Sequence, residues 1–188
     1  MDIKKGLSYV AFGFLFTLVN INLNLNGGSL NITPDFIGWI LFFLAFDKLG
    51  TYISDKKYMK WIALVLAIVT AALWILEMAK PELNVDIIST FVAIVSLVYM
   101  FILFGVLEKI ATDYKSSRAD TLRMLKILNL ALYLAFLGLS LLYLYNKSTY
   151  TVAAAAFTGI AALVAAVFTA FVLFGLRKEI KEYVTEEE

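Results

Sequence analysis

The sequence predicts an all-α membrane protein in which six transmembrane helices form three consecutive helical hairpins. Composition is the first observation: 62% of the 188 residues are hydrophobic and 16% are charged, whereas about a quarter of a soluble domain is charged. The second is the recurrence of apolar runs long enough to cross a bilayer as helices. The third is the uneven distribution of lysine and arginine along the chain. Together they exclude a soluble enzyme and a disordered chain.

Charge-free runs set the expected helix limits. We predict helices near residues 6–20, 34–53, 58–79, 85–112, 122–146 and 150–180. The first apolar run precedes Asn20-Ile21-Asn22, which lacks the small residues of a signal-peptide cleavage site. No linker or second domain is visible in the pattern. Residues 1–188 are therefore expected to form a single integral membrane domain, with hairpin units at about 1–57, 58–117 and 118–188.

Basic residues predict the orientation. If both termini are cytoplasmic, only Lys80 and Lys147 of the 16 lysines and arginines fall in outer loops, which leaves 14 on the inner side. Short loops rich in basic residues face the cytoplasm. We therefore expect a multi-pass protein of the cell membrane with both termini cytoplasmic and the lipid bilayer around it.

The inner ends of the second, fourth and sixth helices resemble one another. Residues 43–49 (FLAFDKL), 104–110 (FGVLEKI) and 174–180 (FGLRKEI) align at spacings of 61 and 70 residues. Each segment would close one hairpin, so the pattern predicts a threefold hairpin repeat. The alternative is that any helix leaving the membrane inward ends in apolar and then charged residues.

Two features resemble known bacterial membrane proteins. Three hairpins in a chain of this length resemble the HdeD-type short-repeat membrane proteins. The stretch TPDFIGW (residues 33–39), followed by an apolar run and DKL (47–49), is similar to a motif of small uncharacterised bacterial membrane proteins. The resemblance implies six helices in a bacterial cell membrane. It implies no activity and no catalytic residue.

An alternating segment, VNINLNLNGGSLNITPD, lies between the first two helices at residues 19–35. Its asparagines share one face of a strand but opposite faces of a helix, and Gly27-Gly28 suits a two-residue β-turn. Folding there pairs Asn26 with Ser29, Leu25 with Leu30, Asn24 with Asn31, Leu23 with Ile32 and Asn22 with Thr33. Every pair matches in polarity, which favours this register. We predict a short outer β-hairpin; an irregular loop that alternates by chance is the alternative.

Asp35 has two interpretations. In Thr33-Pro34-Asp35, Thr suits a helix cap, Pro the first helical position, and an acid favours the helix dipole. Helix length gives the second interpretation, because Asp35 and Asp47 lie only about 18 Å apart along a helix, whereas the hydrocarbon core is about 30 Å thick. If Asp47 lies at the inner boundary, Asp35 and the hairpin reach into the outer leaflet. Alternatively, the helix shifts outward while Lys48 snorkels.

The residue inventory excludes several kinds of chemistry. The chain has no cysteine and no histidine, which excludes thiol and histidine catalysis and the usual zinc sites. A net charge of +1 gives no reason to expect nucleic acid. The acids Asp35, Glu77, Glu82 and Asp86 could bind a hard cation such as calcium, but acids in separate loops are ordinarily solvated. We predict no metal site and no cofactor.

Polar residues in the helices are few. No charge lies in the middle of a predicted helix, where a proton-coupled transporter usually carries one. The polar candidates there are Thr70, Ser96, Tyr99, Asn129, Tyr133 and Ser140. We expect each of them to bond within the bundle.

Three classes of function remain. The lack of buried charge favours a non-enzymatic accessory or interaction protein that acts through its outer hairpin. The alternative is a small oligomeric permease or channel unit for a polar solute, which a cavity beneath residues 20–35 would favour. A membrane enzyme without histidine or cysteine is the third class and the least favoured. The expected ligand or partner surface comprises Asn22, Asn24, Asn26, Asn31, Thr33 and Asp35.

A stripe of small residues runs along the last predicted helix. It comprises Ala154, Thr158, Ala162, Ala166 and Ala170, which recur every fourth residue. Small side chains let membrane helices approach closely, so we expect the stripe to pack on another helix, in the same chain or in a second copy. The expected partners are thus a second copy or another membrane protein. Chance is the alternative, since alanine is common in membrane helices.

Overall fold

The computed structural model describes residues 2–18, 22–25, 28–31, 34–79, 86–145 and 149–186. Within them lie six α-helices and two strands: α1 (Ile3–Leu18), β1 (Asn22–Leu25), β2 (Gly28–Asn31), α2 (Asp35–Leu49), α3 (Lys57–Ala79), α4 (Asp86–Asp113), α5 (Ala119–Tyr145) and α6 (Thr149–Glu186). A 3-10 segment, η1 (Gly50–Lys56), joins α2 to α3. The helices lie where the apolar runs predict them, except that α2 ends at Leu49 and not at residue 53, and α6 continues to Glu186 and not only to residue 180.

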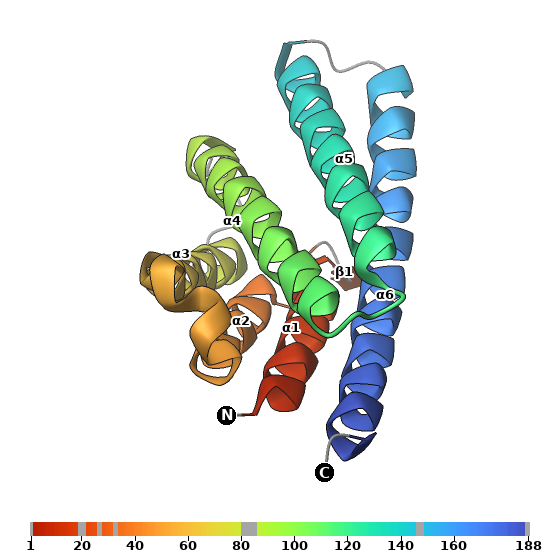
Figure 1. Cartoon of the computed structure of the whole chain (residues 1–188). Helices are drawn as coiled ribbons and strands as arrows, with labels where there is room; N and C mark the ends of the chain where they lie inside the picture. Colours follow the sequence, from red (N-terminus) through yellow and green to blue (C-terminus); the bar gives the residue numbers. More distant parts are fainter. Residues whose placement is uncertain are drawn as a thin grey trace.

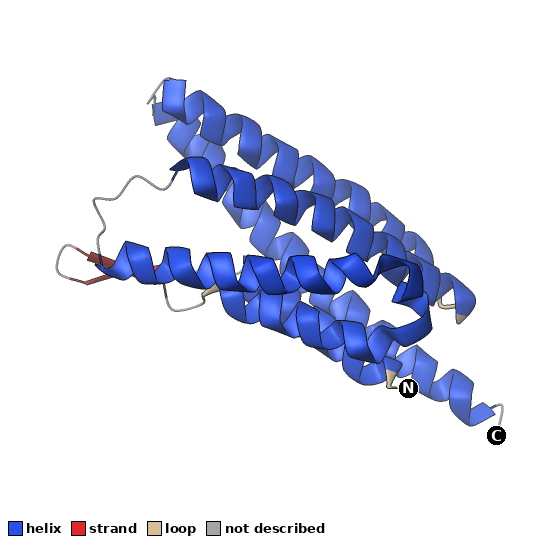
Figure 2. Cartoon of the chain, turned by 90° about the vertical axis from the view of Figure 1, so that its left-hand side faces the viewer, coloured by secondary structure: helices blue, strands red, loops and turns tan. Residues whose placement is uncertain are grey.

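The helices form a ring. Each packs on the next one along the chain, and α1 closes the ring by packing on α6 (Figure 1). The contact between α3 and α4 is the slightest of the six. Both chain termini lie at one end of the bundle and the two strands lie at the other (Figure 2). We call these the terminal end and the strand end.

Within the described residues, four helices are long and apolar enough to cross a membrane. The spans are Lys57–Leu76, Ile87–Asp113, Ala119–Leu139 and Phe157–Ile180. Large hydrophobic side chains are exposed on their outer surfaces, as lipid contact requires; examples are Val65, Phe91, Ile127 and Phe171. The fold is therefore helical and supports a transmembrane protein. By contrast, α1 and α2 have 16 and 15 residues and are about 24 Å and 22 Å long, short of the hydrocarbon thickness of about 30 Å.

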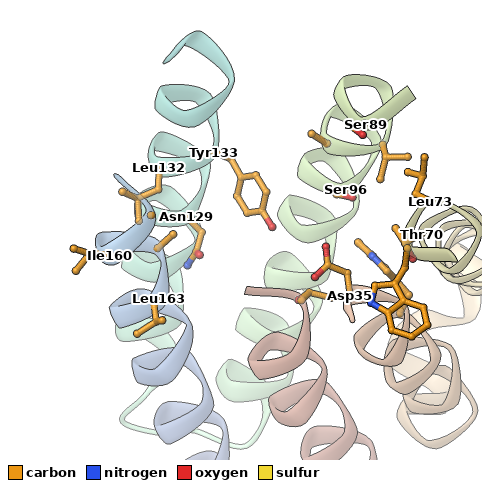
Figure 3. Close-up of a pocket in the computed structure, with 17 residues that line it drawn as sticks. Asp35, Thr70, Leu73, Ser89, Ser96, Asn129, Leu132, Tyr133, Ile160 and Leu163 are labelled. Carbon is orange, nitrogen blue, oxygen red and sulfur yellow. The ribbon is translucent and has the colours of Figure 1, made fainter. Parts of the chain in front are cut away.

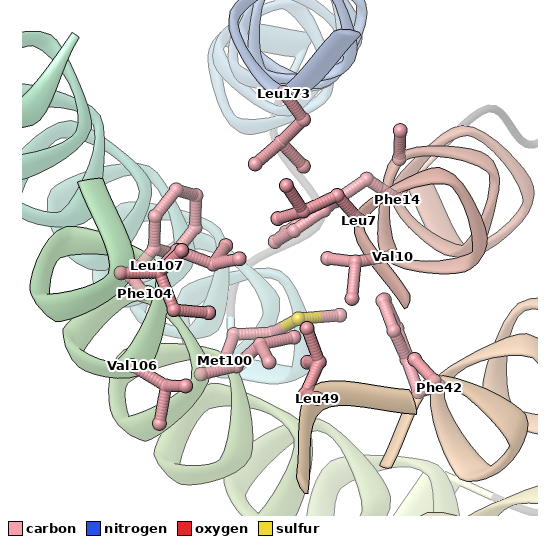
Figure 4. Packing of buried hydrophobic residues seen from close by; sticks show 14 of the residues in the cluster. Leu7, Val10, Phe14, Phe42, Leu49, Met100, Phe104, Val106, Leu107 and Leu173 are labelled. Atoms are coloured by element: carbon pink, nitrogen blue, oxygen red, sulfur yellow. The ribbon is translucent and has the colours of Figure 1, made fainter. Parts of the chain in front are cut away.

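One hydrophobic core fills the half of the bundle nearer the terminal end. At its centre the Phe14 ring lies 5.5 Å from the Phe42 ring and 5.0 Å from the Phe104 ring, measured between centroids. Aliphatic side chains from every helix surround these rings (Figure 4). They include Leu7, Leu49, Met59, Met100, Leu107, Leu122 and Leu173, all 2% exposed or less. This half of the ring is therefore closed by packing.

Ion pairs tie the helices together at the terminal end. The Lys60 ammonium lies 2.6 Å from the Asp47 carboxylate, and the Lys126 ammonium lies 3.0 Å from that of Glu108. Asp47 and Glu108 occupy the same position in the aligned segments 43–49 and 104–110. In the third segment, Glu179 accepts hydrogen bonds from Arg118 Nε (2.9 Å) and from the Ser116 hydroxyl. The three segments thus lie at one end of the bundle. The contact between α3 and α4 is too slight for a well-packed hairpin. Internal repetition therefore stays a prediction.

The register of the two strands differs from the predicted one. β1 and β2 are antiparallel, with Asn22 opposite Asn31, Leu23 opposite Leu30, Asn24 opposite Ser29 and Leu25 opposite Gly28. The predicted pairing was therefore wrong by two residues, and Gly28 belongs to a strand instead of the turn. Asn26 and Gly27, between the two strands in the sequence, lie outside the described residues. A shift by two keeps every side chain on its face, so matched polarity could not distinguish the two registers.

The start of α2 also differs by one residue. The helix begins at Asp35, and Pro34 is its N-cap, with no side-chain hydrogen bond to the cap. The prediction that Pro34 is the first helical residue was therefore wrong. Thr33, the predicted cap, lies outside the described residues. Asp35 does lie in the first turn, where a negative charge favours the helix dipole.

A close approach of α1 and α2 fixes the position of Asp35. A Cβ atom added to Gly38 would lie 2.7 Å from the carbonyl oxygen of Gly13 and would also overlap the Thr17 side chain. Only glycine fits at this crossing. The last turn of α1 and the first turn of α2 are thereby held together at the strand end.

Candidate functional site

A cavity of about 540 Å³ lies between the helices in the half of the bundle nearer the strand end (Figure 3). All six helices line it, from Thr17 in the last turn of α1 to Ile160 in the first half of α6. Its volume lies within the range of small-molecule sites, about 300–1,000 Å³. Its lining residues include the small residues Ala93, Gly159 and Ala162 beside larger aromatic and aliphatic ones.

Polar side chains line the cavity at similar depth in several helices. The Thr70 hydroxyl donates to the Leu66 carbonyl oxygen (2.6 Å), and Asn129 Nδ2 donates to that of Leu125 (2.9 Å). The expectation that these two residues bond within the bundle is confirmed. Each bond uses a donor, so the hydroxyl and amide oxygens keep acceptor capacity. The cavity wall therefore presents acceptors at fixed positions.

Asp35 and Tyr133 face each other across the cavity. The Tyr133 side chain extends from α5 towards Asp35 at the start of α2, and Ser96 of α4 lies beside them (Figure 3). Asp35 is the one charged residue among the described lining residues. Thr17 and Asp35 both line the cavity and flank the segment that carries β1 and β2. The strand pair is therefore attached to the cavity wall at both of its ends.

Aromatic residues form the floor of the cavity. Trp39, which lines the cavity, is 3% exposed, and its ring lies 5.5 Å from the Phe42 ring and 5.2 Å from the Tyr99 ring. Tyr99 is 1% exposed, and its hydroxyl has no hydrogen-bond partner in the described part of the chain. These rings lead directly into the hydrophobic core. The cavity is thus separated from the terminal end by packed aromatic side chains.

The residues predicted to form a ligand or partner surface lie at the cavity, in the two strands or outside the described residues. Asp35 lines the cavity, Asn22 and Asn24 lie in β1, and Asn31 lies in β2. Asn26 and Thr33 lie outside the described residues. Of the helix-packing stripe, Ala166 and Ala170 are buried, Ala162 lines the cavity, and Ala154 and Thr158 are half-buried. The stripe therefore belongs partly to the core and partly to the cavity wall.

Several lining residues were missed by the sequence interpretation. Thr17, Trp39, Trp74 and Ser89 all line the cavity, and none was predicted as a site residue. Thr70, Ser96, Asn129 and Tyr133 were noticed only as bundle residues, and all four line it, whereas the side chain of Ser140 is outside the described part. The available signal was depth, since all of these residues except Asn129 fall in the half of their helix nearer the strand end.

No protein-family model, no curated protein and no solved structure matches the chain. The resemblance to HdeD-type and related small bacterial membrane proteins therefore stays a prediction. Within the described residues, no three acidic side chains gather into a group that could hold a metal ion. Of the four acids considered as cation ligands, Glu82 and the side chains of Glu77 and Asp86 lie outside the described part.

Proposed function

We propose that the protein is a multi-pass protein of a bacterial cell membrane that binds a small polar solute in this cavity and acts as a small permease unit. The observation that carries the proposal is the cavity itself, lined by all six helices and bearing hydroxyl, amide and carboxylate groups. The sequence alone favoured an accessory protein because no buried charge was visible. A cavity next to residues 20–35 favours the alternative.

The proposed topology places the strand end outside the cell. In it, α1 and α2 complete six spans, and the β1–β2 pair lies at the outer side, where short helices let it reach into the outer leaflet. Support comes from the 14 lysines and arginines of the inner segments and from the ion pairs at the terminal end. Cysteines introduced singly at Ser54, Ser116 and Ser148 test it in this cysteine-free chain. Only the one at position 148 should react with an impermeant reagent from outside.

Access to the cavity is proposed to alternate. In this structure the polar lining lies on the strand-end side of the aromatic floor formed by Trp39, Phe42 and Tyr99. A solute that enters from the strand end therefore stops at packed rings. Passage to the other side requires two helices to separate. The pair α3 and α4 should separate with the smallest loss of free energy, because the contact between them is the slightest in the ring.

Acrylamide, a small neutral quencher, tests whether a polar solute reaches the cavity. The double variant Trp61→Phe/Trp74→Phe leaves Trp39 as the single tryptophan, which is nearly buried yet lines the cavity. We expect acrylamide to quench Trp39 fluorescence and the quenching to fall when Ala93→Phe fills the cavity. Ala131→Phe, on an exposed position of α5, is the matched control. An unquenched Trp39 would show that the cavity is closed to solutes.

Liposomes test transport separately from binding. Proteoliposomes with the native chain should swell faster in glycerol or urea than those with Ala93→Phe, while Ala131→Phe should behave like the native chain. Equal swelling of all three, with Trp39 still quenched, would limit the function to binding.

An interaction protein remains the second candidate, and the strand pair favours it. A two-stranded sheet is marginal alone, and within the described residues each strand pairs only with the other, so an edge can accept a strand from another chain. The double variant Asn24→Ala/Asn31→Ala tests this candidate by the oligomeric state in detergent. A loss of oligomer with unchanged Trp39 quenching would favour interaction over solute binding.

A further inference from the structure

The described part of the cavity wall carries charge of one sign. Seventeen described residues line the cavity; among them Asp35 is acidic and none of the others is charged. The nearest lysine along α5 is Lys126, one turn before Asn129. Its ammonium lies 3.0 Å from the Glu108 carboxylate, which Arg123 also approaches at 4.0 Å, and 5.2 Å from the Phe101 ring centroid. Lys126 therefore belongs to an ion-pair group and is not among the described lining residues. The charge that the described part of the wall carries is therefore a carboxylate.

Two indole rings lie near that carboxylate. Trp39 follows Asp35 by one turn of α2, which places both on the same face of the helix, and Trp74 joins them from α3. Both rings are held by neighbours: Trp39 by Phe42 and Tyr99, and Trp74 by Phe36 at 5.7 Å between centroids. A carboxylate and two indole rings in one cavity wall suit an organic cation, because tryptophan is the aromatic residue that attracts cations most strongly.

From this wall we propose that the solute is a small organic cation, a primary amine or a quaternary ammonium compound. The inference rests on the proposed function, since it names the solute class for the same cavity. The carboxylate of Asp35 supplies the counter-charge, Trp39 and Trp74 supply aromatic contact, and the acceptor oxygens of Thr70, Ser96 and Asn129 receive N–H or O–H donors.

Other solute classes fit the wall less well. An anion would be repelled by the carboxylate, and no lysine or arginine is among the described lining residues. A bare calcium ion takes six to eight oxygen ligands, and one carboxylate with scattered hydroxyls does not supply them. The volume of about 540 Å³ also suits a molecule better than a single ion.

Charged thiol reagents measure the proposed field directly. Ser96→Cys places the only thiol of the chain on the cavity wall. Its reaction rate is measured with three methanethiosulfonates: the neutral methyl compound, the cationic trimethylammonium-ethyl compound and the anionic sulfonatoethyl compound. Each rate is divided by the rate of the same reagent with the free thiol 2-mercaptoethanol. We expect the cationic reagent to react faster and the anionic reagent to react more slowly than they do with free thiol, because a fixed negative charge attracts one and repels the other. The ratio of the cationic rate to the anionic rate should therefore be about tenfold or more above the ratio for free thiol. Adding Asp35→Asn should abolish the excess, and adding Asp35→Glu should retain it.

Protection by a ligand completes the test. Phenethylamine, a cation at neutral pH, should slow modification of the introduced cysteine by the neutral reagent, while its neutral analogue 2-phenylethanol should protect much less. If the neutral reagent reacts but the charge ratio equals that of free thiol, or Asp35→Asn leaves it unchanged, the organic-cation inference is overturned and the cavity proposal stands. If the neutral reagent fails to reach position 96, the proposed function and the inference both fall.

Discussion

The two halves of the bundle use the same six helices and fill the space between them differently. Near the terminal end, Phe14, Phe42 and Phe104 meet at ring-centroid distances of 5.0 and 5.5 Å. Near the strand end, the same ring of helices leaves about 540 Å³ open, lined by small residues such as Ala93, by polar residues and by large apolar ones such as Leu73 and Ile160. The difference shows that one ring of helices can close on a core at one end and leave space for a polar wall at the other.

The strongest contrast is expected from matched leucines. Leu107 is 0% exposed in the packed half, and Leu163 is 40% exposed at the cavity. Leu107→Ala should lower the free energy of unfolding by about 2–5 kcal/mol, the range for buried leucines. Leu163→Ala should cost less than about 1 kcal/mol, because it removes few contacts. Denaturant unfolding in detergent measures both, and equal losses would contradict the contrast between the halves.

The crossing of α1 and α2 should be the next most sensitive place. Gly38→Ala forces a methyl group against the Gly13 carbonyl oxygen and Thr17, and we expect it to cost about 1–3 kcal/mol, as overpacking does. Gly138→Ala is the control, because an added Cβ there meets nothing within 4 Å. Gly138→Ala should be neutral or slightly stabilising, since alanine favours a helix over glycine. A harmless Gly38→Ala would mean that the crossing does not fix the cavity wall.

Ion pairing at the terminal end should contribute least. Glu179→Gln removes the charge that Arg118 contacts at 2.9 Å between two partly exposed groups, and we expect a loss of about 0.5–1 kcal/mol. The loss should shrink in high salt, because ions screen exposed pairs. Asp2→Asn breaks the exposed Lys5–Asp2 pair and should change nothing measurable. A salt-independent loss at Glu179 would assign its role to the hydrogen bonds from Ser116 and Ser117.

The sequence predicted the helices well because their limits depend on local hydropathy. It predicted the strand segment from alternation, but alternation repeats every two residues and could not separate the true register from one shifted by two. The cavity was harder to predict. Its wall combines Thr17, Asp35, Thr70, Ser96 and Tyr133, which lie on five different helices, and only their tertiary arrangement brings them to one depth.

Asp35 shows the same limit at a single residue. Its position at the start of α2 was readable from Pro34-Asp35 and the following apolar run. Its place in a cavity depends on Gly38, which lets α2 approach α1 closely, and on α5, which brings Tyr133 opposite it (Figure 3). A sequence pattern in α2 contains neither of these facts.

The most direct test of an open strand-end half and a closed terminal half uses three alanines. Ala93 lines the cavity, whereas Ala63 and Ala111 are 0% exposed in the packed half. Each is changed singly to cysteine, and its reaction with neutral methyl methanethiosulfonate is timed in detergent. The structure predicts rapid modification for Ala93→Cys and rates about a hundredfold lower or less for Ala63→Cys and Ala111→Cys, since a buried thiol reacts only on local opening. Similar rates at all three positions, or no reaction at position 93, would contradict it.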